Sequence, residues 1–148
     1  MASTDLHKQN NTMDATSWVL LFARFSIAPL FFYSGIGKVM AFSATAARLY
    51  GGALGFGKVL AAGAIAVELG CGTALVLGLF ARQAAFILIL FTISATLMFH
   101  NFWAAPEAQV VTQTINFLKN FGLLGLLTLI AYYGAGKCAV GAALKRVS

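Results

Sequence analysis

The chain has 148 residues, of which 60% are hydrophobic and only 9% are charged, and its formal net charge is +6. A soluble domain usually carries about 25% charged residues, so this sequence lacks the polar residues that would cover a soluble surface. The composition argues against a soluble enzyme, a nucleic-acid-binding domain and a disordered segment, and it predicts an integral membrane protein.

The ten Lys and Arg residues are spread along the chain, mostly at the ends of apolar runs, and only Lys145 and Arg146 are adjacent. Nucleic-acid binding needs basic residues gathered on one face, whereas isolated cations beside apolar runs meet lipid headgroups. We therefore expect membrane lipid as a partner and no nucleic acid. The cysteines, Cys71 and Cys138, show no metal-binding or dithiol spacing, so we expect neither a metal site nor an intrinsic redox centre.

Four apolar runs are long enough to cross a bilayer, which takes about 20 mostly apolar residues. They follow a polar N-terminal tail, residues 1–17, that has no secretory signal. A basic C-terminal tail, residues 139–148, follows them. The sequence thus predicts an all-α integral membrane protein, an antiparallel four-transmembrane-helix bundle. Its membrane domain covers residues 18–138, with spans at about 18–39, 59–80, 84–100 and 117–133.

The connections between the spans differ in character. The first, residues 41–57, is rich in glycine and is expected to hold irregular backbone or a short interfacial helix through SATAARLY. Arg82 and Gln83 are expected to form a tight turn, which makes the second and third spans antiparallel neighbours. The third connection, residues 101–116, is predicted to be amphipathic and interfacial.

The distribution of basic residues predicts the orientation in the membrane. Five Lys and Arg residues lie on the side of the two tails and the second loop, and four lie on the opposite side. Because cytoplasmic segments carry the excess of Lys and Arg, we expect both termini in the cytoplasm.

Glu68 and Arg24 are charged residues inside predicted spans. A charge at the bilayer centre costs roughly 2.5–3.5 kcal/mol on insertion scales, and it marks a function or a buried partner. Two interpretations stay open, a structural ion pair between Glu68 and Arg24, or a role in ligand binding or proton handling. Lys38, at the end of the first span, has a simpler interpretation as a lysine that snorkels to the membrane surface.

Polar residues also gather where antiparallel threading brings span ends together. The set suits an anionic or carbonyl-bearing headgroup, because it combines cations, amides and an imidazole that can donate or accept protons. Ordinary membrane-interface residues are the alternative interpretation. The residues are Lys38, His100, Asn101, Lys119 and Asn120.

The second span carries small residues at every fourth position, Ala62, Ala66, Gly70, Ala74 and Gly78. Small residues allow helix backbones to approach closely within a membrane. We expect this row to pack inside the bundle, and a homo-oligomer interface is the alternative.

Five motifs together resemble the DoxX family, in its order and spacing, over about residues 18–138. They are RFSIAPLFFYSGIGKV at 24–39, Glu68 before a run of small residues, GLFAR at 78–82, HNFW at 100–103 and FLKN at 117–120. The resemblance implies a four-helix protein of the bacterial inner (plasma) membrane. It also implies a quinone-linked redox role, because the family takes its name from a subunit of a thiosulfate:quinone oxidoreductase.

We therefore expect a subunit that binds a quinone or another lipid-like ligand and is linked to a redox complex without a redox centre of its own. His100 and Lys119 are expected to hydrogen-bond the headgroup and Asn101 and Asn120 to orient it, while Glu68 handles protons or pairs with Arg24. Electrons would come from another membrane or membrane-associated protein subunit. The alternative is a structural or assembly subunit of a larger membrane complex, with no ligand chemistry.

Overall fold

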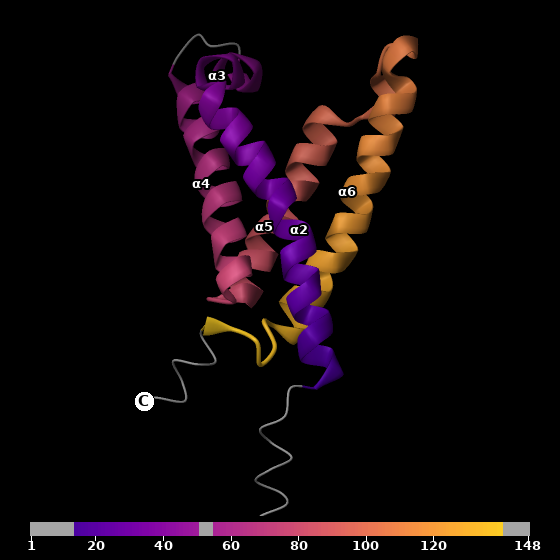
Figure 1. The fold of residues 1–148 in the computed structure, drawn as a ribbon. Helices are drawn as coiled ribbons and strands as arrows, with labels where there is room; N and C mark the ends of the chain where they lie inside the picture. Colours follow the sequence, from indigo (N-terminus) through magenta and orange to yellow (C-terminus); the bar gives the residue numbers. More distant parts are fainter. Residues whose placement is uncertain (1–13, 51–54, 141–148) are drawn as a thin grey trace, which may run out of the picture.

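The computed structural model describes residues 14–50 and 55–140, and in these ranges the regular structure is entirely helical (Figure 1). Four of the helices are long and apolar enough to cross a membrane, which confirms the predicted all-α membrane bundle. The elements are α2 (Ala15–Met40), α3 (Phe42–Tyr50), α4 (Phe56–Leu77), α5 (Ala81–Phe99), the short 3₁₀ helix η1 (Phe102–Ala104) and α6 (Glu107–Tyr133).

Large apolar side chains cover the outside of the bundle. Phe22 is 76% exposed, Tyr33 84% and Phe121 69%. In water such a surface would be unfavourable, but in a bilayer it faces lipid tails that are equally apolar. The apolar outer surface and the length of the four helices therefore both indicate a membrane environment.

The fourth spanning helix begins earlier than predicted. α6 starts at Glu107, so most of the predicted interfacial connection 101–116 is helix. Pro106 precedes the helix with a φ of −55°, and Glu107 places a carboxylate in its first turn, where the helix dipole favours negative charge. The amphipathic pattern in this region thus belongs to an extension of α6.

The turn between the second and third spans also lies elsewhere than predicted. Arg82 and Gln83 are part of α5, and the chain turns just before it, at Gly78 to Phe80. Gly78 ends α4 with a φ of +70°. A glycine suits this left-handed position because it has no Cβ to clash.

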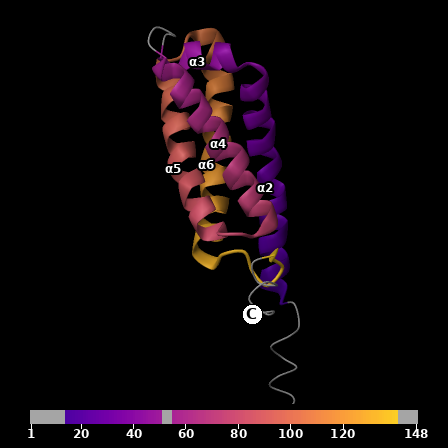
Figure 2. The ribbon, with the colours of Figure 1, turned by 90° about the vertical axis from the view of Figure 1, so that its left-hand side faces the viewer.

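The expected short helix in the first connection is α3, and it packs on α4. The two backbones approach so closely that a Cβ on Gly57 would overlap the carbonyl oxygen of Ala46. Gly51 and Gly52 of the glycine-rich connection lie outside the described residues. Figure 2 shows α3 at one end of the bundle, opposite the end where α2 begins.

The tightest packing lies at the end where α2 begins. α2 packs mainly against α4, and α5 packs against both α6 and α4. Figure 1 shows α2 and α4 leaning away from α6 toward the end that carries α3. The core consists of Ala23, Ile27, Phe31, Leu75, Ala81, Ala84, Ala85, Leu88, Leu127 and Ile130.

The row of small residues on α4 does not pack inside the bundle as expected. Ala62, Ala66 and Gly70 are exposed, and a Cβ on Gly70 would meet no atom within 4 Å. Ala74 is partly buried and Gly78 is buried, so only the end of the row reaches the core. α4 instead turns a different face inward, which carries Ala61, Glu68, Gly72 and Leu75.

Candidate ligand-binding site

A cavity of about 1190 Å³ lies toward the α3 end of the bundle, and all five α-helices contribute to its wall. Most of the wall is apolar, with residues such as Leu30, Leu60, Val67 and Leu123. A small number of polar groups in a mostly apolar cavity is typical of a site for a small molecule. The polar and charged residues in the wall are Ser34, Lys38, Thr45, Arg48, Glu68, Thr92, Ser94, His100, Lys119 and Asn120.

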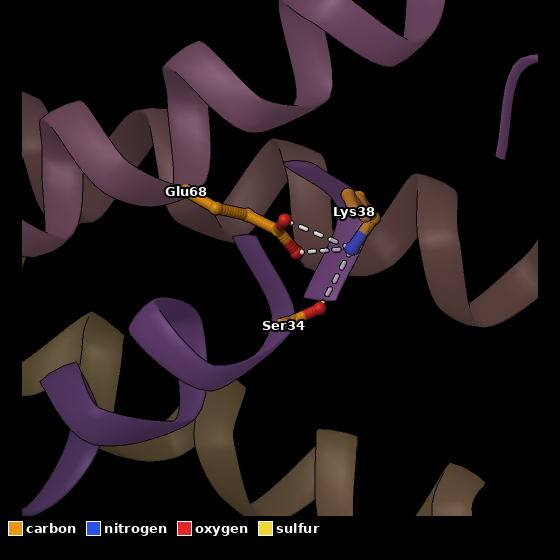
Figure 3. A network of polar contacts seen from close by, with 3 residues as sticks. All are labelled: Ser34, Lys38 and Glu68. Atoms are coloured by element: carbon orange, nitrogen blue, oxygen red, sulfur yellow. Dashed lines mark hydrogen bonds and ion pairs between the residues drawn. The ribbon is translucent and has the colours of Figure 1, made fainter. Parts of the chain in front are cut away.

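Lys38 on α2 and Glu68 on α4 form an ion pair in the wall (Figure 3). Lys38 Nζ lies 2.8 Å from both carboxylate oxygens of Glu68 and donates a further hydrogen bond to Ser34 Oγ at 2.7 Å. Only 4% of the Glu68 side chain is exposed, against 26% of that of Lys38. Gly35 allows the helices to meet here, because a Cβ on it would lie 2.7 Å from Cδ2 of Leu69.

The ion pair between Glu68 and Arg24 that the sequence left open is therefore wrong, and Lys38 does not snorkel to the surface. Arg24 and Lys38 lie roughly 21 Å apart along α2, at 1.5 Å per residue. Only Lys38 is at the depth of Glu68. Depth along the helix, rather than charge alone, decides the pairing.

Arg24 instead holds the opposite end of the bundle together. Its side chain is fully buried and donates hydrogen bonds to the backbone carbonyls of Leu75, at 3.2 Å, and Cys138. Leu75 lies in the last turn of α4, where its carbonyl also accepts the capping N–H of Gly78 at 3.2 Å and the helix dipole favours a cation. Arg24 therefore has a structural position, and it is not among the residues that line the cavity.

Two hydrogen bonds join α5 to α6 beside the cavity. Asn120 Nδ2 donates to Thr96 Oγ1 at 2.9 Å, and His100 Nδ1 lies 2.8 Å from Oε1 of Gln113. Both bonds hold a predicted site residue in a fixed direction. Asn120 and His100 still have other polar atoms that can meet a ligand.

Thr92 is a site residue that the sequence analysis did not single out. It is 5% exposed and lines the cavity, and its Oγ1 has no hydrogen-bond partner within residues 14–50 and 55–140. Buried polar groups are nearly always hydrogen-bonded, and an unmade bond costs about 1–3 kcal/mol. The sequence signal that could have found it is the spacing of Thr92, Thr96 and His100 at steps of four, which puts all three on one face of a helix.

Comparison with known proteins decides the family. The DoxX family model matches residues 19–101, which is more than half of the chain. The chain belongs to the DoxX family. It is also similar to inner membrane protein YphA of Escherichia coli (strain K12), with 32% identity over 120 residues, which cover 80% of this chain and 84% of that protein. No solved structure matches it significantly.

The family and the four apolar helices make this DoxX protein a multi-pass inner membrane protein. The matched range contains most of α2 and all of α3, α4 and α5, and therefore Lys38, Glu68, Thr92 and His100 of the cavity wall. Lys119 lies on α6, outside that range.

Four of the five headgroup residues predicted for this DoxX protein line the cavity. The fifth, Asn101, does not, because the chain leaves α5 at His100 and Asn101 begins the 3₁₀ helix η1. Within the part of the chain that the structure describes, no three His, Cys, Asp or Glu residues are placed to hold a metal ion. The four lining residues are Lys38, His100, Lys119 and Asn120.

Proposed function

We propose that this DoxX protein binds a quinone or another lipid-like ligand in the cavity. The observation that carries the proposal is the combination of a large, mostly apolar cavity with polar groups in its wall, including the unpartnered hydroxyl of Thr92. An isoprenoid or acyl tail would lie against the apolar residues, and the headgroup would take the polar ones.

Each polar group has a distinct role in this proposal. His100 and Lys119 hydrogen-bond the headgroup oxygens, Asn120 orients the headgroup, and Thr92 gains the partner that its hydroxyl lacks. Glu68 neutralises Lys38 and exchanges protons with the ligand. Reduction of a quinone consumes electrons and protons, and the electrons would come from a partner redox protein, because this sequence carries no paired cysteines or cofactor motif.

The basic residues further support an orientation in which both termini are cytoplasmic. The α3 end, with the cavity, would then face the periplasmic side of the membrane. Cysteine-labelling with a membrane-impermeant reagent tests this part. A cysteine placed at exposed Ala47 of α3 is expected to be labelled in intact cells, and labelling only after lysis would reverse the orientation.

The ligand site is tested by titrating the detergent-solubilised protein with decylubiquinone, using equilibrium dialysis as the readout. Thr92→Val keeps the shape of the side chain but removes the hydroxyl, so we expect about a tenfold loss of affinity. Thr73→Val is the matched control, because Thr73 is exposed on α4 and does not line the cavity. No saturable binding, or equal losses in both variants, would overturn the proposed site.

A structural or assembly subunit is the second candidate, and one observation favours it. The exposed row Ala62, Ala66 and Gly70 on α4 offers a smooth surface on which another helix, from a second copy or a partner subunit, can pack closely. Gly70→Leu would then disrupt the complex that is purified in mild detergent, while Thr92→Val would leave it intact. A complex that survives Gly70→Leu but is lost in Thr92→Val would exclude this candidate.

A further inference from the structure

The charges in the cavity wall do not balance. Three cations line the cavity, Lys38, Arg48 and Lys119, but Glu68 is the only carboxylate among the lining residues that the structure describes. Glu68 is already paired with Lys38. The other two cations take part in no ion pair within the described ranges, 14–50 and 55–140. The cavity therefore carries a net positive charge.

The two remaining cations are held by neutral partners. The guanidinium carbon of Arg48, on α3, lies 5.4 Å from the centre of the Phe99 ring on α5, a cation–π contact. Lys119 Nζ, on α6, donates to Asn116 Oδ1 at 3.0 Å. These contacts position the two side chains but leave their charge uncompensated. The two cations line the cavity from different helices, Arg48 from α3 and Lys119 from α6.

We propose that the cavity selects an anionic headgroup, a phosphate or a carboxylate on an apolar tail, and that Arg48 and Lys119 bind it. This inference rests on the proposed ligand site and specifies the charge of its occupant. Arg48 is suited to this role because the planar guanidinium can donate two parallel hydrogen bonds to phosphate or carboxylate oxygens.

A neutral quinone headgroup gains only hydrogen bonds from these residues, so it binds more weakly than an anionic amphiphile of similar tail. Glu68 limits the preference of the cavity for anionic headgroups, because its carboxylate neutralises the charge of Lys38. Glu68→Gln removes that neutralisation and frees the Lys38 charge. The variant is therefore expected to bind an anionic amphiphile more tightly than the wild-type protein does.

The test compares ligands that share a tail and differ in charge. Full-length protein in a neutral detergent is titrated with dioleoyl phosphatidate, with dioleoylglycerol and with inorganic phosphate, and binding is followed by native mass spectrometry. We expect phosphatidate to bind at least about tenfold more tightly than dioleoylglycerol, and phosphate alone to bind weakly. A parallel titration with oleate distinguishes a carboxylate from a phosphate as the favoured headgroup.

Charge-removing variants show which residues carry the preference. Arg48→Gln and Lys119→Gln are each expected to lower phosphatidate affinity about tenfold and to lower dioleoylglycerol affinity much less, because the neutral ligand loses at most a hydrogen bond. Lys58→Gln is the control, since Lys58 is an exposed cation near the α3 end of α4 that does not line the cavity. A loss of the same size in Lys58→Gln would overturn the assignment of the two residues.

The outcomes separate this inference from the proposed function. Equal affinities for phosphatidate and dioleoylglycerol would overturn the charge preference but leave a lipid-like ligand in the cavity. Absence of saturable binding of every amphiphile, decylubiquinone included, would overturn the proposed function itself. Phosphate that binds as tightly as phosphatidate would show that the apolar wall contributes nothing, and would overturn the amphiphile as the ligand class.

Discussion

Lys38 and Glu68 are brought together from helices that are connected through α3, with Nζ of the lysine 2.8 Å from both carboxylate oxygens. The pair lies in the cavity wall, toward the end where α2 and α4 lean away from α6 (Figure 1). It joins α2 to α4 and fixes the charge of one side of the cavity. Mutation can separate the contribution of the pair to stability from its effect on the charge of the cavity.

Removal of one partner is expected to destabilise the protein. Lys38→Met leaves the Glu68 carboxylate buried without a counter-ion, which costs about 3–5 kcal/mol for a fully buried pair and less here, because Lys38 is partly exposed. The double variant Lys38→Met/Glu68→Leu is expected to regain much of this loss. Reversible unfolding in mixed detergent micelles measures the free energy of unfolding of the single and the double variant. A double variant as unstable as the sum of two single variants would contradict the ion pair.

Gly78 is expected to be far less tolerant of alanine than Gly70 on the same helix. Gly78 has a φ of +70°, and a Cβ there would overlap Nη1 of Arg24. A left-handed residue with a side chain costs roughly 1–2 kcal/mol before any crowding. Gly70→Ala fills open space and improves helix propensity by up to about 1 kcal/mol. Thermal unfolding of both variants gives the comparison, and similar melting temperatures would contradict the position assigned to Arg24.

Gly57→Ala is expected to displace α3 from α4 and, with it, Arg48 from the cavity. The added methyl group would overlap the carbonyl oxygen of Ala46. Gly70→Ala is the matched control, since a Cβ there meets nothing within 4 Å and Gly70 does not line the cavity. Limited proteolysis of α3, together with phosphatidate binding, measures the effect. Unchanged protection and affinity in Gly57→Ala would show that α3 does not need this contact.

The start of α2 is expected to lose stability in acid. Hydrogen bonds from Ser17, from its side chain and then its backbone, hold the pKa of Asp14 below its ordinary value, and the charge of Lys137 adds to this. A lowered pKa means that the folded state favours the ionised carboxylate. Its stabilising contribution is therefore complete above the unfolded-state pKa of about 3.9 and is lost as the pH falls through the lower, folded-state pKa.

Hydrogen exchange of the first turn of α2, compared between pH 6 and pH 3 after correction for intrinsic rates, measures this loss. Asp14→Asn is the control, because it cannot ionise and should remove this part of the pH dependence. The effect is expected to be small, since the carboxylate is largely in contact with solvent. An equal pH dependence in both proteins would exclude Asp14 as its source.

The spans and half of the polar residues in the cavity wall could be predicted from the sequence, because both follow from the order of apolar and polar residues along the chain. An apolar run must cross the membrane, and antiparallel threading then brings the ends of neighbouring spans together. This places Lys38, His100, Lys119 and Asn120 near one another without knowledge of the packing. The beginning of α6 was missed because an amphipathic helix extension has the same composition as an interfacial loop.

The pairing of charges could not be predicted, because it depends on how two helices are rotated and shifted against each other. Glu68 faces Lys38 only because Gly35 lets α2 approach α4 at that depth. Arg48 lines the cavity because α3 packs on α4. The residues next to Arg48 in the sequence do not indicate this packing. The sequence also did not show that the row of small residues on α4 is exposed. Small residues favour close packing of helices, but they do not determine which helix packs against them.

The most direct test of a ligand in this cavity is native mass spectrometry of the protein released gently from its own membrane, with lipid extraction of the same sample. We predict that the protein retains a stoichiometric amphiphile, and that Thr92→Val and Arg48→Gln retain less of it than Thr73→Val and Lys58→Gln. A protein that leaves the membrane with an associated subunit but no bound small molecule, in the wild type as in the variants, would contradict the ligand-binding account.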